Sequence, residues 1–239
     1  MRRAPRRTGF FRPEPRVNFE GSAMTQDLAN AYRRDGYAAL RGFVPREVAN
    51  GFLARMKGDL ERQGVHMDRL RQEGPLLSRA ASELYGFHYP PMATFHWGMT
   101  PAVEALVGEP LLPSYSYFRL YREGDICRVH GDRFACEHSL SLTLAYSHDR
   151  PWALEVSPAR TEKPYQRADA AFREDERAQA VDMNAGDAVL YQGVHHHHGR
   201  TTGNPNAWSA HLFLHWVSRD GPYAAEAFDK HPPPPRVTF

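Results

Sequence analysis

The 239-residue chain contains few cysteines and no long apolar run. Its two cysteines, Cys127 and Cys136, are too few for the disulfide framework of a small secreted protein. They also lack the tight C-x-x-C spacing of structural zinc sites, so we expect two buried free thiols. No apolar stretch approaches the roughly 20 residues that span a bilayer, and the N-terminus lacks the apolar segment of a signal peptide. These absences predict a cytoplasmic protein with no membrane partner.

A strong charge imbalance is also absent, since 30 lysines and arginines face 28 aspartates and glutamates. The positive excess lies in an N-terminal arm, residues 1–24, which carries two glutamates and six arginines: Arg2, Arg3, Arg6, Arg7, Arg12 and Arg16. This arm has a net charge of +4, and subtracting it from the total of +2 leaves −2 for the rest of the chain. A nearly neutral body does not favour nucleic acid as its partner. We expect the arm to be disordered.

The remaining residues, 25–239, fit one domain whose pattern changes near residue 113. Residues 25–112 are expected to be mostly helical, with helices at 25–34, 46–63, 76–85 and 101–106, a short strand at 37–40 and an irregular segment at 89–98. Residues 113–220 show eight short strands, at 114–122, 126–131, 138–146, 152–156, 180–183, 187–192, 194–198 and 207–217, and a polar loop at 157–175. This pattern predicts a mainly β protein with flanking helices and a jelly-roll core. Residues 221–239 form a C-terminal tail that includes the stiff Pro232–Pro235 segment.

His130 and Asp132 are separated by one residue in a predicted strand. Alternate side chains of a strand point to the same face, so this imidazole and this carboxylate converge as a metal chelate requires. Two histidines and one carboxylate hold the metal of non-heme Fe(II) oxygenases. A cupin-like metal site without redox chemistry can use the same residue types. Both classes need a second histidine from a distant part of the chain.

The tract of four histidines at 195–198 supplies candidates for that second histidine. On a strand, His196 and His198 share one face while His195 and His197 share the other. The tract follows a Gly-Asp pair and a predicted strand inside the chain, so it is not an expression tag.

Three segments resemble parts of one superfamily. Tyr121–Asp132 resembles the Y-x-x-G-x-x-x-x-x-H-x-D segment of prolyl-hydroxylase-like 2-oxoglutarate oxygenases. Gly186–His198 resembles the G-D…H strand that carries the distal histidine of that family. Tyr32–Pro45 is similar to the opening helix and strand of phytanoyl-CoA-dioxygenase-like members. The chain thus resembles the Fe(II)/2-oxoglutarate-dependent dioxygenase superfamily, which implies a double-stranded β-helix, the jelly roll of these enzymes.

The resemblance implies an enzyme that uses Fe(II), 2-oxoglutarate and O2 to hydroxylate a C–H bond, with release of succinate and CO2. It implies His130, Asp132 and His198 as the catalytic iron ligands, because the Y-x-G…H-x-R pattern of some branches maps onto residues 191–200 without gaps. His197 is the next candidate for the distal ligand, and His196 is a candidate for a supporting role.

The family usually binds the far carboxylate of 2-oxoglutarate with a basic residue about ten positions after the distal histidine. Residues 206–211 contain no arginine or lysine. Arg200 is the nearest guanidinium and can form a bidentate pair with a carboxylate. Tyr121, Ser209 and His211 are predicted to assist it. Arg119 and Arg133 are alternatives, although Arg133 is equally suited to pair with Glu137.

Two other classes of function stay open at this point. Four consecutive histidines and the missing basic residue also fit a non-catalytic, cupin-like metal-binding jelly roll, and the Arg-rich arm fits an interaction protein. Prolyl-hydroxylase-like branches modify peptides and phytanoyl-like branches act on small molecules. The expected substrate is therefore a small molecule or a peptidyl residue, and the sequence does not indicate an oligomeric state.

Overall fold

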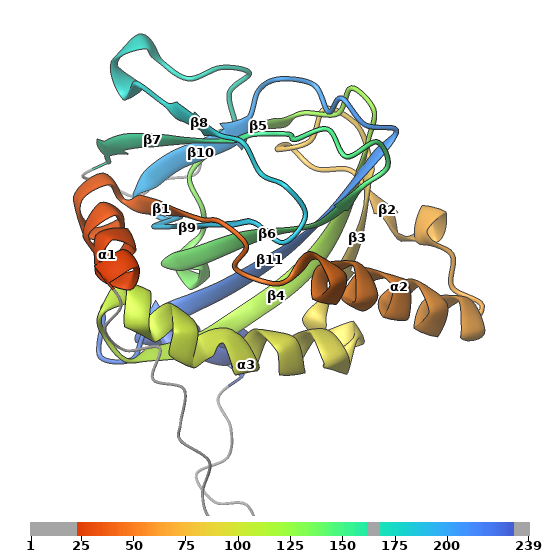
Figure 1. The fold of residues 1–239 in the computed structure, drawn as a ribbon, viewed down its shortest axis with the longest axis horizontal. Helices are drawn as coiled ribbons and strands as arrows, with labels where there is room; N and C mark the ends of the chain where they lie inside the picture. Colours follow the sequence, from red (N-terminus) through yellow and green to blue (C-terminus); the bar gives the residue numbers. More distant parts are fainter. Residues whose placement is uncertain (1–22, 162–167, 232–239) are drawn as a thin grey trace, which may run out of the picture.

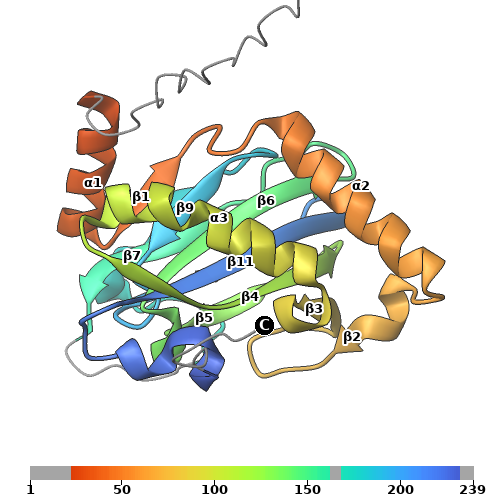
Figure 2. The same ribbon diagram turned by 90° about the horizontal axis from the view of Figure 1, so that it is seen from below.

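The computed structural model describes residues 23–161 and 168–231 (Figure 1). Nearly all of the Arg-rich arm and the whole Pro232–Pro235 segment lie outside the described residues, so the predictions for them are not addressed. The described chain forms two antiparallel sheets that face each other, and helices cover the outer face of the larger sheet (Figures 1 and 2). This is the predicted mainly β jelly roll with flanking helices, and the predicted fold class is confirmed.

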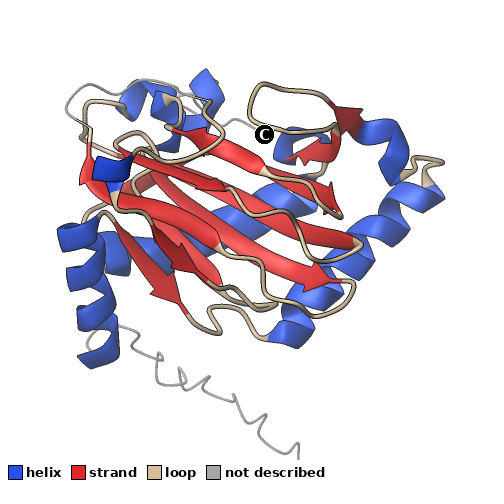
Figure 3. Cartoon of the chain, turned by 90° about the horizontal axis from the view of Figure 1, so that it is seen from above, coloured by secondary structure: helices blue, strands red, loops and turns tan. Residues whose placement is uncertain are grey.

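The larger sheet contains seven strands: β1 (Tyr37–Leu40), β2 (Arg71–Gln72), β3 (Ala81–Tyr85), β4 (Leu111–Arg122), β6 (His138–Tyr146), β9 (Ala188–Tyr191) and β11 (Trp208–Ser218). The smaller sheet contains β5 (Cys127–His130), β7 (Leu154–Arg160), β8 (Gln179–Val181) and β10 (His196–Arg200). The strand orders are β1-β9-β6-β11-β4-β3-β2 and β5-β10-β7-β8. Seen from above in Figure 3, both sheets lie in front of the longer helices.

Three α-helices flank the sheets: α1 (Ala23–Asp35), α2 (Arg46–Arg62) and α3 (Pro90–Val107). Short 3-10 segments connect the elements: η1 (Met67–Leu70), η2 (Gly86–His88), η3 (Phe134–Cys136), η4 (Glu174–Glu176) and η5 (Ala224–Lys230). Helix α2 buries Met56 and Leu60 four positions apart and packs on β6, and α3 packs on β4. Within the described ranges, no helix has the length and apolarity that crossing a membrane requires.

Alternation along β11 separates two environments. Leu212 and Leu214 are fully buried in the apolar core beneath the helices. The alternate residues Phe213 and His215 point to the opposite face of β11. They line a cavity in the space between the two sheets. The main apolar core therefore lies outside the jelly roll. Between the two sheets, a smaller apolar cluster that includes Leu154, Val156 and Val189 lies beside polar and aromatic side chains.

The structure differs from the sequence prediction in two places before residue 112. Residues 76–85 were expected to be helical, but Ala81–Tyr85 is strand β3 and pairs with β4. Pairing along its full length outweighs the helix preference of its alanine, glutamate and leucine. Residues 89–98 were expected to be irregular, but they belong mostly to α3. This helix begins with two prolines, which the first turn tolerates, and continues past Pro101.

The eight strands predicted after residue 113 are all present, with shifts at their ends. The largest shift is in β7, which continues to Arg160 and so takes up the start of the predicted loop at 157–175. Both cysteines are free and buried, as predicted.

Candidate metal centre

Strands β5 and β10 bring two histidines together in the smaller sheet. His130 ends β5, and His198 in the middle of β10 lies directly opposite it in the antiparallel register. Their ring centroids are 4.3 Å apart. Asp132 follows in the loop after β5, and its backbone N–H donates to the carbonyl of Gly193 at 2.8 Å. The pair was predicted to share one strand, whereas the strand ends at His130 and the loop turns the carboxylate back toward it.

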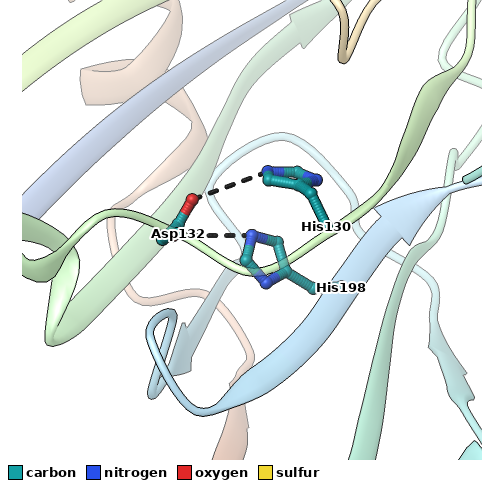
Figure 4. Close-up of side chains that lie close together, drawn as sticks. All are labelled: His130, Asp132 and His198. Atoms are coloured by element: carbon teal, nitrogen blue, oxygen red, sulfur yellow. Dashed lines mark ion pairs between the residues drawn. The ribbon is translucent and has the colours of Figure 1, made fainter. Parts of the chain in front are cut away.

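The three side chains converge on one point (Figure 4). The Nε2 atom of His130 lies 3.5 Å from Oδ1 of Asp132, and Nε2 of His198 lies 3.5 Å from Oδ2. One ligand-type atom from each residue lies within 4.8 Å of the other two. All three side chains are largely buried. The predicted triad is therefore assembled, with spacing that suits a single metal ion.

Hydrogen bonds to the backbone set the tautomer of both imidazoles. The Nδ1 atom of His130 lies 2.8 Å from the carbonyl oxygen of Arg128, and Nδ1 of His198 lies 3.0 Å from that of His196. A carbonyl only accepts, so each Nδ1 carries the hydrogen and each Nε2 presents a lone pair. This orientation is the one that metal-ligating histidines usually have.

The surroundings keep Asp132 ionised. Burial alone would raise the pKa of Asp132, but the neighbouring imidazoles of His198 and His130 more than offset it and hold that pKa well below its usual value. The hydroxyl of Ser139 also donates to Oδ2 at 3.3 Å. A Cβ atom at Gly193 would lie 2.2 Å from the same oxygen, so the backbone there approaches the carboxylate as only glycine allows. Two histidine nitrogens and an ionised carboxylate suit Fe(II) and other divalent transition metals.

The other three histidines of the tract point elsewhere. The Nδ1 atom of His196 donates to the carbonyl of Ser157 at 2.9 Å, and Nδ1 of His197 contacts the buried carboxylate of Glu176 at 2.5 Å. His195 lies at the other end of the tract, 3.3 Å from the hydroxyl of Tyr223. Strand β10 changes register between His196 and His198, so the two do not act as simple neighbours on one face. The geometry favours His198 over the runner-up His197.

Arg200 and Tyr121 line the same small cavity as the triad. Arg200 is fully buried, donates to the carbonyl of Trp152 and lies 4.7 Å over that ring. Within the described ranges it has no carboxylate partner. The Tyr121 hydroxyl accepts a hydrogen bond from Arg119 at 2.9 Å. His211 lies 3.5 Å from Arg200, and its buried Nε2 has no hydrogen-bond partner among the described residues.

Burial, with the charges of Arg200 and Arg119, holds the pKa of His211 well below its usual value, so this imidazole is neutral. The Ser209 hydroxyl donates to Asn204 at 2.7 Å, and so it is already engaged away from the triad. Of the four predicted cosubstrate residues, Tyr121 and Arg200 lie in the cavity of the triad and His211 borders Arg200. Ser209, in β11, is hydrogen-bonded to Asn204.

Sequence reasoning missed a buried ion pair next to this cavity. Arg119 contacts Glu83 at 2.7 Å, and both side chains are less than one-tenth exposed. The prediction that Arg133 pairs with Glu137 is wrong, because Arg133 pairs with Asp229 at 2.9 Å. Glu137 instead accepts a hydrogen bond from the backbone of Ser218, which draws it toward β11.

Two spaces adjoin the triad. The inner cavity, with Arg200 and Tyr121, has a volume of about 20 Å³. The outer recess has a volume of about 400 Å³ and is walled by Tyr85, Tyr115 and Tyr117. His130 and Asp132 border both spaces. The triad thus lies where a small-molecule recess meets a narrow cationic cavity.

Comparison with solved structures supports the architecture. No protein-family model matches the sequence, and no curated protein matches it. A non-heme α-ketoglutarate-dependent carbocyclase of nogalamycin biosynthesis, SnoK, aligns with a TM-score of 0.62 at 15% identity, over 82% of this chain and 84% of its own. A prolyl-4-hydroxylase of Pseudomonas putida aligns with a TM-score of 0.52 at 17% identity, over 82% of this chain and 100% of its own. This chain has the fold of the Fe(II)/2-oxoglutarate-dependent oxygenases.

A third oxygenase-fold structure is HygX from Streptomyces hygroscopicus, solved with nickel, 2-oxoglutarate and hygromycin B. It aligns with a TM-score of 0.58 at 12% identity, over 82% of this chain and 88% of its own. The resemblance inferred from the three sequence segments is thus confirmed at the level of the fold. Because the similar structures include a carbocyclase and an epimerase as well as a hydroxylase, this oxygenase fold does not itself specify a reaction.

Proposed function

We propose that the protein is an Fe(II)- and 2-oxoglutarate-dependent oxygenase that hydroxylates a C–H bond of a small molecule or a peptidyl residue. The observation that carries this proposal is the convergence of His130, Asp132 and His198 inside the oxygenase fold. When bound, Fe(II) supplies the coupling of O2 reduction to the oxidative decarboxylation of 2-oxoglutarate to succinate and CO2.

The triad would hold Fe(II) through the Nε2 atoms of His130 and His198 and the carboxylate of Asp132. The two Nε2 lone pairs and the ionised Asp132 provide three ligands, and backbone hydrogen bonds fix the orientation of both rings. His130 and Asp132 border the outer recess as well as the inner cavity, whereas His198 borders only the inner cavity. A substrate in the recess is therefore placed next to the reacting centre.

The role of Arg200 and Tyr121 is to bind the far carboxylate of 2-oxoglutarate. Arg200 is a buried cation without a carboxylate partner among the described residues. An unpaired buried charge lowers the stability of the fold, and binding of an anion would offset that loss. Tyr121 lines the same cavity. Its hydroxyl accepts a hydrogen bond from Arg119 and can at the same time donate its own hydrogen to the carboxylate of 2-oxoglutarate. A cavity of about 20 Å³ has room for about one water molecule. Binding of 2-oxoglutarate therefore requires the lining side chains to move apart.

The comparisons bear on the substrate only in general terms. SnoN was solved with nogalamycin RO and HygX with hygromycin B, and both are small molecules. A recess of about 400 Å³ falls within the range of small-molecule sites. These observations favour a small molecule over a peptide as the substrate of this chain.

Two measurements test the proposal. Without oxygen, addition of Fe(II) and 2-oxoglutarate should give a weak visible charge-transfer band, and admission of air should give succinate. Replacement His198→Ala should abolish both signals. Replacement His196→Ala is the matched control, since His196 lies on the same strand and bonds away from the triad. Absence of both signals from the wild-type protein contradicts the proposal.

A non-catalytic metal-binding jelly roll is the second candidate. The small inner cavity and the lack of arginine or lysine in β11 favour it. This candidate predicts tight binding of Ni(II) or Zn(II) to the triad and no effect of 2-oxoglutarate on the metal affinity. A metal titration with and without 2-oxoglutarate separates the two candidates.

A further inference from the structure

Cys136 and Tyr115 lie in contact beside the triad. The Sγ atom of Cys136 is 3.2 Å from the hydroxyl oxygen of Tyr115. Cys136 is 1% exposed and ends η3, whereas Tyr115 lies in β4. The contact therefore joins two separate elements, and the fold rather than the local chain holds the thiol against the phenol.

The sulfur also lies next to the proposed iron ligands. Ligand-type atoms of Asp132, Cys136 and His215 lie within 4.8 Å of one another. Asp132 belongs to the triad as well, so the thiol is a near neighbour of the place where O2 would be reduced. Oxidising equivalents that fail to reach a substrate meet this thiol and this phenol among the first groups nearby.

The sulfur contacts Tyr115 at its hydroxyl, while other side chains lie over the ring. The guanidinium carbon of Arg133 lies 4.1 Å over this ring, and the imidazole of His215 stacks on it at 4.6 Å with an interplanar angle of 25°. These two contacts occupy ring faces, whereas the hydroxyl next to Cys136 lies in the ring plane. The contact with the hydroxyl brings the sulfur within reach of the ring carbon ortho to that hydroxyl.

We propose that Cys136 and Tyr115 become joined by a thioether between Sγ and the ring carbon ortho to the hydroxyl. The S–H bond and one ring C–H bond break, one C–S bond forms, and the pair loses two hydrogens and two electrons. One O2 and one 2-oxoglutarate are consumed, and succinate, CO2 and one water are released. The water carries both hydrogens and the remaining oxygen atom. This inference rests on the proposed oxygenase function, which supplies the oxidant.

The thioether would change the site in two ways. It would tie β4 to η3, which follows the loop of Asp132, and so would fix Tyr115 in the wall of the outer recess. It would also remove an oxidisable thiol from the neighbourhood of the iron. The second thiol, Cys127, forms no hydrogen bond with a phenol within the described ranges and serves as the internal comparison.

Mass spectrometry of the full chain tests the proposal. The protein is loaded with Fe(II) without oxygen and then given 2-oxoglutarate and air, and it is measured after treatment with a thiol reductant. The expected result is a mass decrease of two hydrogens that survives reduction. Trypsin should then release one joined peptide made of residues 80–119 and 134–160. A decrease already present in protein from aerobic cells supports the proposal equally.

Three variants and one parallel assay decide the outcome. Cys136→Ala and Tyr115→Phe should each abolish the mass decrease, and Cys127→Ala should retain it. Succinate measured in the same samples reports on the oxygenase function separately. Succinate formation without a mass decrease contradicts the thioether but is consistent with the oxygenase function. Absence of both succinate and the mass decrease contradicts both the thioether and the oxygenase function. Addition of oxygen to Cys136, in place of hydrogen loss, also overturns the thioether.

Discussion

The guanidinium of Arg200 lies 4.7 Å over the indole ring of Trp152 and donates to the carbonyl of the same residue. Burial of an arginine is costly, and a ring face with one carbonyl compensates it only in part. Arg119, the other cation of this cavity, already has Glu83 as its partner. The uncompensated charge is therefore that of Arg200, and it marks the end of the cavity at which an anion should bind.

Replacement Arg200→Gln should raise the KM for 2-oxoglutarate roughly tenfold to 100-fold, since a hydrogen bond to a charged group contributes about 1.5–3 kcal/mol. Arg200→Lys should recover part of the loss, because it keeps the charge without the planar fork. The measurement is succinate formation as a function of 2-oxoglutarate concentration. Arg122→Gln is the control, because Arg122 pairs with Asp68 at the surface. An unchanged KM in Arg200→Gln would exclude Arg200 as the anchor.

Gly193→Ala should weaken Fe(II) binding about 10- to 100-fold, the usual effect of disturbing the support of a metal ligand. The added Cβ would lie 2.2 Å from Oδ2 of Asp132 and 2.8 Å from the carbonyl oxygen of Cys136, so the carboxylate must move. Anaerobic Fe(II) titration measures the change.

The matched control for this substitution is Gly51→Ala in helix α2. A Cβ at Gly51 meets nothing within 4 Å, and alanine there should stabilise the helix by about 1 kcal/mol. Its Fe(II) affinity should equal that of the wild type. If Gly193→Ala also binds Fe(II) with wild-type affinity, Asp132 does not hold the metal.

Much of the centre could be predicted because its signals are local. The spacing of His130 and Asp132 is weak evidence for a chelate by itself and gains weight from Tyr121–Asp132 and Gly186–Arg200. The short β runs between turn residues suggest the jelly roll. The choice of His198 among four histidines came from the resemblance, since parity along a strand leaves His196 equally placed. The register change between His196 and His198, which turns only the latter to the triad, has no sequence signal.

The parts that could not be predicted depend on distant pairing. Glu83 lies 36 positions before Arg119, in a stretch whose composition favours helix, and only the β3–β4 register places the two side by side. The ion pair between Arg133 and Asp229 also joins distant segments. It forms in place of the predicted pair with Glu137, which is only four positions from Arg133. Ion pairs between remote segments leave no periodic pattern in the sequence.

The buried pair of Arg119 and Glu83 should couple strongly in stability. Glu83→Gln alone leaves a buried cation without its charge partner and should lower the free energy of unfolding by about 3–5 kcal/mol. Arg119→Met combined with Glu83→Gln should recover most of that loss, because both charges are then removed. Urea unfolding of the two single variants and the double variant measures the coupling. Additive losses would show that the pair is not coupled.

The stability of the protein should fall as pH falls below about 6.5, partly because of His138. This imidazole is buried between the hydroxyls of Tyr32 and Ser218, and burial lowers its pKa from 6.5 to about 4. Between pH 6.5 and about pH 4, His138 is therefore protonated in the unfolded chain but not in the folded chain. The contribution is fully present above the unfolded pKa and is lost as pH falls toward the folded pKa, by at most about 3 kcal/mol.

Comparison of the wild type with His138→Gln isolates this contribution. Two other buried histidines, His96 and His215, have pKa values lowered by burial to about 3 and about 4, and they act in the same direction in both proteins. Glu109 and Glu137 lie 3.7 and 4.0 Å from Nε2 of His138 and would partly compensate its protonation, which makes the stated loss an upper value. Urea unfolding from pH 7.5 to pH 4.5 should therefore show a shallower decline for His138→Gln. Parallel declines would mean that His138 becomes protonated in the folded protein with little cost.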